Sequence, residues 1–283
     1  MPDRLVKEHM DISVARQLID LNTRFYRDNA ASFSATREAP WDGWRRIVAH
    51  AAACAGALAP GKPLKMLDLA CGNMRLERFL SEELPKASFE FHAVDNCSAL
   101  AAGTPLPAGV VYHNVDVLGA LLDAASGGSK ESPLNELPAC AFTCCFGFMH
   151  HVPSLELRVA VLRELVRRTA PGGIIAVSFW QFMHDERLAS KAHDAEEAAR
   201  ERGLLAPAVL EAFEPGDHLL GWQDGTNLRY CHHFEEREID RLIAALPAGT
   251  VRAFERYSAD GRAGNLNRYV LLRRTSAKLA RSA

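Results

Sequence analysis

The stretch 66–73, Met-Leu-Asp-Leu-Ala-Cys-Gly-Asn, constrains the fold more than any other part of the chain. Residues 65–69 are an apolar run of strand length that breaks at Cys71-Gly72-Asn73 and reopens as a predicted helix over residues 74–83. A strand that ends in a glycine turn before a helix presents backbone N–H groups and the positive end of the helix dipole to a ligand. The sequence therefore predicts a nucleotide-type binding site at this turn.

A second strand-like run, residues 89–94, ends at Asp95. An acidic side chain at this tip is placed to accept hydrogen bonds from the two hydroxyls of a ribose. The spacing of Asp68, Gly72 and Asp95 resembles the signature of class I S-adenosylmethionine (SAM) methyltransferases, whereas a dinucleotide fingerprint needs three spaced glycines. The alternative is a turn that merely closes a strand and a helix in another α/β domain.

The rest of the chain supplies the elements that this signature implies. Strands are predicted at residues 65–69, 89–94, 110–115, 141–146, 174–180, 251–257 and 267–272, and helices at residues 12–30, 44–58, 74–83, 155–169, 186–202 and 235–246. The resemblance predicts an α/β fold with a doubly wound, Rossmann-like methyltransferase sheet. This sheet is expected to be mostly parallel, with an antiparallel C-terminal strand pair and helices on both faces.

Shifts in the pattern divide the chain into regions. The predicted regions are an N-terminal helical lid (1–62), a SAM-binding core (63–180), a substrate-side insertion (181–228), and the C-terminal part of the methyltransferase sheet with a basic tail (229–283). The aromatic-rich end of the lid has no clean period and is expected to lie across the cofactor pocket. The alternative is a packing strap in which Phe33 and Trp41 serve only as hydrophobic anchors.

Three segments receive more specific interpretations. Residues 124–138 are polar and rich in glycine, and are expected to form a flexible surface loop. Residues 229–234 are expected to bring the chain back to the main sheet after the insertion. The basic residues near the C-terminus are expected to lie in a solvated, disordered end; they are Arg273, Arg274, Lys278 and Arg281.

Composition limits the class of protein. The chain has 283 residues and a formal net charge of -2, so any RNA binding has to come from a local patch. The sequence lacks a run of about twenty apolar residues and an N-terminal signal pattern, which predicts a cytoplasmic protein without a membrane segment. The seven cysteines have no regular spacing and are expected to be reduced thiols. No metal site is expected, because the cysteines and histidines between Cys140 and His151 contain no Cys-x-x-Cys pair.

Four blocks outside the SAM motifs make the resemblance narrower. They are Phe33-Ser-Ala-Thr-Arg37 with Pro40-Trp41, Asp217-His-Leu-Leu-Gly-Trp222, residues 229–238 and residues 264–270. Together they resemble the eukaryotic-type tRNA methyltransferases, which esterify 5-carboxymethyluridine at the wobble position of the anticodon. The similarity runs from about residue 26 to residue 272. The chain departs from the family pattern at Ala70, Met74, Cys140 and Gly221.

The resemblance implies a set of site residues. Cofactor-binding residues for SAM are expected at Asp68, Ala70, Gly72, Asn73, Asp95, Asn96, Asp116, Val117, Phe146 and Gly147. A carboxylate acceptor is already ionised at neutral pH, so its methylation needs no general base, only positioning and exclusion of water. The candidates for catalysis are Arg37, His151 and Arg229, and the candidates for stacking on a base or walling the pocket are Trp41, Trp180 and Tyr230. Each has a structural alternative, as a surface charge or as a core side chain.

Three functions remain open from the sequence. The first is a SAM-dependent methyltransferase that acts on the carboxymethyl group of a tRNA wobble uridine. The second is a small-molecule O- or N-methyltransferase, favoured by the balanced charge and the insertion. The third is a noncatalytic, methyltransferase-like partner subunit, suggested by Met74, whose side chain could crowd the methionine moiety of the cofactor. Enzymes of the wobble family work with a small zinc-binding protein, so the resemblance also raises an activating partner.

Overall fold

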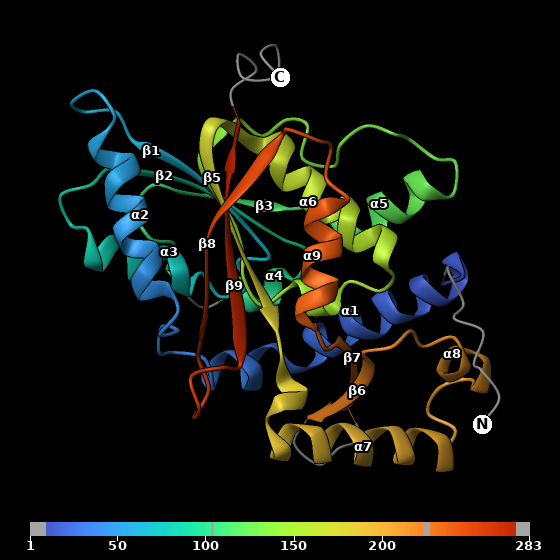
Figure 1. Cartoon of the computed structure of the whole chain (residues 1–283). Coiled ribbons are helices and arrows are strands. Elements are labelled where there is room, and N and C mark those ends of the chain that lie inside the picture. The colour runs from blue at the N-terminus through green and yellow to red at the C-terminus, as the bar shows by residue number, and fades with distance from the viewer. Residues whose placement is uncertain (1–9, 103–104, 223–226, 276–283) are drawn as a thin grey trace.

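The centre of the protein is a seven-stranded sheet, seen in a computed structural model that describes residues 10–102, 105–222 and 227–275 (Figure 1). The strand order is β3-β2-β1-β4-β5-β9-β8, and β1 to β5 are parallel, whereas β9 runs antiparallel to both β5 and β8. The strands are β1 (Leu64–Leu69), β2 (Phe89–Asp95), β3 (Val110–Asn114), β4 (Cys140–Cys145), β5 (Thr169–Trp180), β8 (Val251–Ala259) and β9 (Asn267–Arg274). The predicted fold class, a mostly parallel sheet with an antiparallel C-terminal pair, is confirmed.

Helices cover both faces of the sheet because its strands are apolar on both sides (Figure 1). Ile174 and Ile175, adjacent on β5, enter opposite hydrophobic clusters, as the two-residue period of a strand requires. α2 and α3 pack on one face, α5, α6 and α9 pack on the other, and α1 crosses the lower edge of the sheet in Figure 1. These helices are α1 (Ile12–Ala35), α2 (Trp44–Gly56), α3 (Arg75–Glu83), α5 (Val117–Ala125), α6 (Leu155–Arg168) and α9 (Glu236–Ala244), with the short α4 (Ser98–Ala101) after β2.

The segment between β5 and α9 forms a separate layer. It contains α7 (Glu186–Glu201), α8 (Pro207–Glu211), and a hairpin of β6 (Asp217–Trp222) and β7 (Asn227–His232). These two strands pair only with each other among the described residues, so the expectation that residues 229–234 rejoin the main sheet is wrong. The edge of β5 that faces away from β4 is taken by β9, in a register that pairs Ile174 with Arg273.

A buried ionic cluster joins this layer to the core. The side chain of Arg158, on α6, is only 1% exposed and lies 3.1 Å from Asp217, 3.1 Å from Glu238 and 3.3 Å from Glu214. His232 lies between two of these carboxylates, 2.6 Å from Asp217 and 2.7 Å from Glu238. Because the partners come from α6, α9 and the β6–β7 hairpin, the cluster fixes the hairpin against the core.

Two further local expectations are corrected by the structure. The first helix continues to Ala35 rather than residue 30, because its aromatic residues form one packed face. Residues 124–125 end α5, and residues 126–131 are exposed, as predicted for a surface loop. The last part of the loop is anchored, since Arg168 donates to the carbonyls of Leu134, Asn135 and Leu137.

The C-terminal charges divide into two groups. Arg273 and Arg274 belong to β9 and donate to backbone carbonyls, Arg273 to that of Gly172 at 3.0 Å, so they are not part of a disordered end. Lys278 and Arg281 lie outside the described residues. None of the helices in the described part of the chain combines the length and apolar character needed to cross a membrane.

Candidate functional site

A cavity of about 380 Å³ lies along the edge where the parallel strands end. Its floor is built by residues at the carboxyl ends of β1 to β5, from Ala70 after β1 to Trp180 at the end of β5. Ligands in open α/β sheets bind at this edge, because the strand order reverses here and leaves a crevice. The volume is within the range of about 300–1,000 Å³ that is usual for ligand and cofactor sites. The end of α1 and the residues that follow it form the roof.

The turn after β1 is held in a strained conformation. Ala70, Gly72 and Met74 all have positive φ, at 67°, 55° and 58°. The backbone N–H of Gly72 donates to Oδ2 of Asp95 at 2.9 Å, which ties the turn to the tip of β2. Met74 is fully buried in a small cluster with Cys71 and Ala93 and does not line the cavity. Its side chain therefore leaves the cavity free, contrary to the crowding considered from the sequence.

One side of the cavity is acidic. Asp68, Asp95 and Asp116 line it from the ends of three neighbouring strands. Burial raises the pKa of Asp95, while N–H donors from Cys97, at 2.8 Å, and Gly72 counteract that rise. Asp116 also caps α5, because it accepts the N–H of Gly119 at 3.0 Å. Carboxylates in this arrangement can accept hydrogen bonds from sugar hydroxyls and amino groups.

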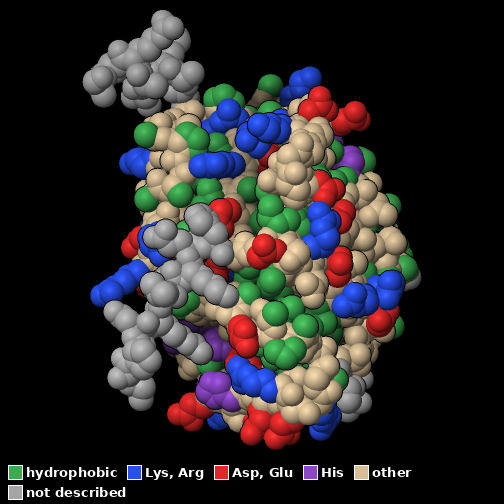
Figure 2. All heavy atoms as spheres, turned by 90° about the vertical axis from the view of Figure 1, so that its right-hand side faces the viewer, with side chains coloured by type: hydrophobic (Ala, Val, Ile, Leu, Met, Phe, Trp, Pro, Cys, Tyr) green, Lys and Arg blue, Asp and Glu red, His purple; other side chains and the backbone are tan. Residues whose placement is uncertain are grey.

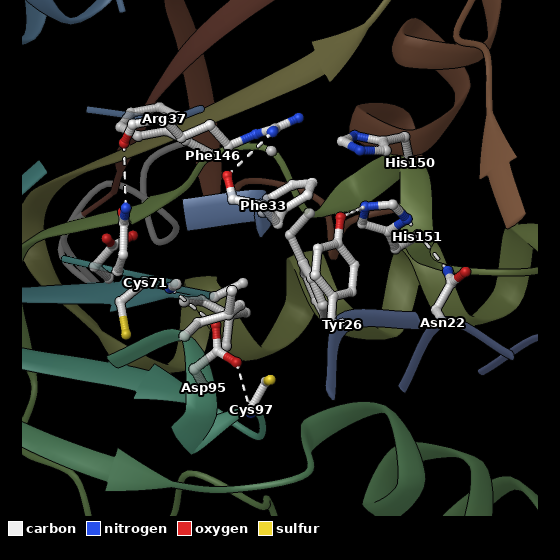
Figure 3. Close-up of a pocket in the computed structure, with 18 of the residues that line it drawn as sticks. Asn22, Tyr26, Phe33, Arg37, Cys71, Asp95, Cys97, Phe146, His150 and His151 are labelled. Atoms are coloured by element: carbon white, nitrogen blue, oxygen red, sulfur yellow. Dashed lines mark hydrogen bonds between the residues drawn. The ribbon is translucent and has the colours of Figure 1, made fainter. Parts of the chain in front are cut away.

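The opposite side is cationic and aromatic. Figure 3 shows Asp95 on one side of the cavity and Arg37, Phe33, His150 and His151 on the other. The guanidinium of Arg37 stacks 3.4 Å above the ring of Phe33, and that of Arg229 lies 5.7 Å from the same ring. No acidic side chain among the described residues pairs with either arginine. Burial and the nearby charge of Arg229 lower the pKa of Arg37 to about 10.

His151 is a neutral, fully bonded histidine. Its Nδ1 lies 3.1 Å from the carbonyl oxygen of Tyr230 and 3.2 Å from the amide nitrogen of Asn22. Its Nε2 is hydrogen-bonded to the hydroxyl of Tyr26, at 2.6 Å. Asn22 shares the same carbonyl at 3.1 Å and accepts the Tyr230 N–H at 2.8 Å. Burial, with the charge of Arg229, lowers the pKa of His151 to about 3.

His150 completes this end of the cavity. Its ring lies 4.6 Å from that of Trp180 and 4.0 Å from that of His151. Burial and the neighbouring His151 lower its pKa. Its Nδ1, like Nε of Arg229, is buried and has no hydrogen-bond partner among the described residues. Buried polar atoms are nearly always paired in folded proteins, so these two atoms mark a place for a polar ligand group.

Trp41 closes the roof over the end of β4. A side chain at Gly147 would meet the Trp41 ring at 2.9 Å, so only glycine allows this close approach. Gly43, two residues after Trp41, is held by Asp260. The carboxylate of Asp260 accepts the N–H of Gly43 at 3.0 Å and the hydroxyl of Tyr269 at 2.6 Å. The tip of the β8–β9 hairpin therefore holds the segment that carries Trp41.

The structure brings nearly all of the predicted site residues to this one cavity. The predicted residues that line it are Arg37, Trp41, Asp68, Ala70, Gly72, Asn73, Asp95, Asn96, Asp116, Val117, Phe146, Gly147, His151, Trp180 and Arg229. Tyr230 is the exception, and its prediction as a stacking residue is wrong. Adjacent strand residues face opposite sides, so Arg229 faces the cavity while the Tyr230 hydroxyl bonds to Asp217 at 2.6 Å and Arg158 at 2.9 Å.

Several lining residues were missed from the sequence. They are Asn22, Tyr26, Trp44, Arg75, His150, Asp260 and Asn267. Asn22 and Tyr26 are one helical turn apart, so a polar pair on the apolar face of α1 was the available signal. Asp260 carried no signal, because its role depends on how the β8–β9 hairpin folds against the roof.

Two groups of side chains have the composition of a metal site: His150, His151 and Cys231, and His184, His233 and Glu235. In the first, both nitrogens of His151 are already hydrogen-bonded. In the second, Nδ1 of His233 accepts the N–H of Met183 at 3.2 Å, so Nε2 carries the hydrogen and donates to Glu235 at 3.1 Å. A metal ion needs that nitrogen lone pair free. As arranged, neither group presents a complete set of ligands.

Comparison with known proteins identifies the fold. No family model matches the chain, and no curated protein matches it in sequence. Among solved structures, a SAM-dependent methyltransferase from Methanosarcina mazei superposes with a TM-score of 0.51 at 16% identity, over 77% of this chain and 98% of its own. The plantazolicin methyltransferase BpumL, in complex with SAH, gives 0.52 at 12% identity, over 94% and 98% of the two chains. Human N-acetylserotonin methyltransferase, in complex with SAM, gives 0.50 at 14% identity, over 91% and 59%. The chain therefore has the fold of the SAM-dependent methyltransferases.

Proposed function

We propose that this protein is a SAM-dependent methyltransferase that esterifies a carboxylate, and that its acceptor is the carboxymethyl group of a wobble uridine in tRNA. One observation carries the proposal. The cavity has an acidic side, formed by Asp68, Asp95 and Asp116, and a cationic side, formed by Arg37 and Arg229. A cationic cofactor and an anionic acceptor suit these two sides.

The residues of the acidic side fit the cofactor. Asp95 would hold the ribose hydroxyls and Asp116 the adenine amino group, while the turn around Gly72 leaves room for the amino-acid portion. When bound, the cofactor supplies an electrophilic methyl group on a sulfonium. The fold and the cofactors named for its structural neighbours support this assignment.

The cationic side fits a carboxylate acceptor. Arg37 and Arg229 offer guanidinium groups that match a carboxylate by paired hydrogen bonds, and no described acidic residue neutralises them. A carboxylate is ionised at neutral pH, so no proton has to leave it. The two histidines are neutral, and His151 has both nitrogens engaged, so its proposed role is to orient the Tyr26 hydroxyl. Trp41 and Phe33 exclude water from the reacting oxygen.

The tRNA acceptor is supported by where the family-like blocks lie. Phe33 and Arg37 from the first block, Arg229 from the third and Asn267 from the fourth all line the cavity. Trp222, from the second block, packs against Phe33 at a ring separation of 5.4 Å. Segments that are far apart in the sequence thus line one cavity, as expected if together they recognise one acceptor molecule.

The geometry also limits how an RNA can bind. Arg229 is only 7% exposed, so a backbone phosphate on the surface cannot reach it, whereas a base turned out of its stack can. Figure 2 shows basic and acidic side chains interspersed on the side of the molecule that faces right in Figure 1. Because the charges on that face are mixed, it offers no basic patch for RNA. We therefore propose that the RNA binds at the mouth of the cavity.

A small carboxylic acid is the second candidate acceptor. It is favoured by the depth of Arg229 and by the net charge of -2, which gives no overall attraction for RNA. The noncatalytic interpretation loses its basis, because it rested on Met74 and that side chain is packed away from the cavity.

Two measurements test the proposal. Calorimetric titration with S-adenosylhomocysteine is expected to show binding that Asp95→Ala abolishes; absence of binding to the unmutated protein would overturn the methyltransferase assignment. Transfer from methyl-labelled SAM is then compared on tRNA carrying 5-carboxymethyluridine, on the same tRNA with unmodified uridine, and on a panel of small carboxylic acids. Label only in the first supports the tRNA acceptor, whereas label only in the small acids would replace it with the second candidate.

A further inference from the structure

Trp222, the last residue of β6, packs on the C-terminal end of α1 without lining the cavity. Its ring centroid lies 5.4 Å from that of Phe33, and its Nε1 donates to Oγ of Ser32 at 3.2 Å. Both partners belong to the last turns of α1, and Arg37 directly follows Thr36, the C-cap of this helix. The β6–β7 hairpin is therefore joined through Trp222 to the segment that brings Arg37 to the cavity.

The guanidinium of Arg37 lies against two aromatic rings. Its Cζ is 3.4 Å from the centroid of the Phe33 ring and 5.3 Å from that of the Trp222 ring. Its Nη1 donates to the hydroxyl of Thr36 at 2.8 Å and to the carbonyl of Phe33 at 3.4 Å (Figure 3). No acidic residue of the described ranges forms an ion pair with Arg37. The aromatic faces therefore replace an acidic partner in fixing this guanidinium.

The aromatic contacts oppose a repulsion between two cations. The Cζ of Arg229 lies 5.7 Å from the same Phe33 ring, so both guanidinium groups lie close to one side chain. Burial lowers the pKa of Arg37, and the charge of Arg229 lowers it further. Like charges that are partly out of water repel, whereas the face of an aromatic ring attracts a guanidinium. The Phe33 and Trp222 rings thus keep Arg37 near Arg229 before an anion is bound.

We propose that Trp222 is a positioning residue of the acceptor site, which holds the Arg37 guanidinium against Phe33 and so sets its place relative to Arg229. Trp222 acts through Arg37 and does not touch the acceptor. The proposal rests on the proposed function, because it takes the ligand of the two arginines to be the carboxylate acceptor.

Steady-state kinetics of two variants test this role. Trp222→Leu removes the aromatic face and is expected to raise the KM for the acceptor by about 3–30-fold, the range for an arginine–aromatic contact. The kcat should change by less than about twofold, because the contact is lost equally before and in the transition state. Trp222→Phe keeps a ring and should stay within about threefold of the unmutated KM. The acceptor is the one that takes label from SAM, either tRNA carrying 5-carboxymethyluridine or a small carboxylic acid.

A double variant separates action through Arg37 from a general structural effect. In Arg37→Gln, the further change Trp222→Leu is expected to alter KM by less than about twofold, because two residues that act as a unit are not additive. Phe254→Leu is the matched control. Phe254 carries a similar stack outside the cavity, with Cζ of Arg273 5.0 Å from its ring, so its loss should leave KM and kcat unchanged.

Nuclear magnetic resonance tests the stack without catalysis. Protons above an aromatic face resonate upfield, so the Hδ signals of Arg37, identified by their loss in Arg37→Gln, should lie upfield in the unmutated protein. They should also show nuclear Overhauser contacts to the Trp222 ring. In Trp222→Leu these signals are expected to move towards the position of an unstacked arginine, whereas Phe254→Leu should leave them in place.

The outcomes separate this inference from the proposed function. If no acceptor takes label, the proposed function fails and the inference fails with it. If an acceptor is methylated but the KM effects of Trp222→Leu and Arg37→Gln are additive, or Trp222→Phe is as impaired as Trp222→Leu, the positioning role is wrong while the function stands. Arg37 signals without an upfield shift or a contact to Trp222 would also overturn it. That measurement uses the unmutated protein, so it decides the matter even where Trp222→Leu does not fold.

Discussion

The Tyr26 hydroxyl and Nε2 of His151 are 2.6 Å apart, and burial of this pair keeps the histidine neutral in the folded protein. Its pKa is lowered to about 3, whereas a histidine in the unfolded chain has a pKa of about 6.5. Between these values the unfolded chain binds the extra proton. We therefore expect the free energy of unfolding to fall as pH decreases from about 6.5 towards 3, by up to about 1.4 kcal/mol per pH unit from this residue.

Urea denaturation at several pH values between 7.5 and 4.5 checks this expectation. His151→Gln is expected to flatten the pH dependence, because the titrating group is gone. Tyr26→Phe serves as the control, since it removes the hydrogen bond but keeps a buried histidine and should retain most of the slope. An unchanged slope in His151→Gln would contradict the assignment.

Arg37 and Arg229 are expected to act on the acceptor and not on the cofactor. Replacing Arg37 by glutamine should raise the KM for a carboxylate acceptor by about 10–100-fold, the value of a charged hydrogen bond, and leave the affinity for S-adenosylhomocysteine within about threefold. Steady-state kinetics and calorimetry on the same preparation measure both quantities. Arg27→Gln is the matched control, because Arg27 lies on α1, ten residues before Arg37, with a side chain that is 64% exposed. Equal loss of cofactor affinity in Arg37→Gln would show that the cationic side does not select the acceptor.

Ala70 and Met74 share the left-handed conformation but differ in what their side chains do. Ala70→Gly should stabilise the protein by about 0.5–1 kcal/mol, because relief of the strain exceeds the added freedom of the unfolded chain. Met74→Gly relieves the same strain but empties a buried position, so it should destabilise the protein by about 2 kcal/mol or more. Thermal and chemical denaturation of the two variants give the comparison. Two shifts of the same sign would contradict the packing of Met74 beneath β2.

The sequence was sufficient to predict the core and the residues of the acidic side of the cavity. Asp68, Gly72 and Asp95 lie at strand ends, and strand ends are marked by where an apolar run stops, so local pattern locates them. The residues of the cationic side were harder to predict from the sequence. Arg229 and Tyr230 are adjacent, and which of them faces the cavity depends on the pairing of β7 with β6, a strand that was not predicted. Asp260 depends on a contact between distant segments, which no periodicity records.

Arg158 is expected to be the most sensitive position outside the site. Its replacement by methionine leaves Asp217, Glu214 and Glu238 without their shared cation, and loss of one partner of a buried ion pair costs about 3–5 kcal/mol. Chemical denaturation measures this cost. Arg163→Met on the same helix is the control, since Arg163 reaches only the carbonyl of Ala245, at 3.2 Å, from an exposed position. A loss below about 1 kcal/mol in Arg158→Met would mean that the cluster does not hold the hairpin to the core.

Gly147 and Gly172 allow the steric role of Trp41 to be separated from backbone strain. Both glycines have positive φ, at 70° and 81°, so alanine is strained at either position. Only at Gly147 does the added methyl group meet another side chain, the ring of Trp41 at 2.9 Å, whereas at Gly172 it meets nothing within 4 Å. Both variants should lose about 1–2 kcal/mol of stability from strain. Gly147→Ala alone should also displace Trp41, lower methyl transfer by tenfold or more and shift the tryptophan fluorescence. Equal activity in the two variants would show that the roof over the end of β4 does not shape the reacting site.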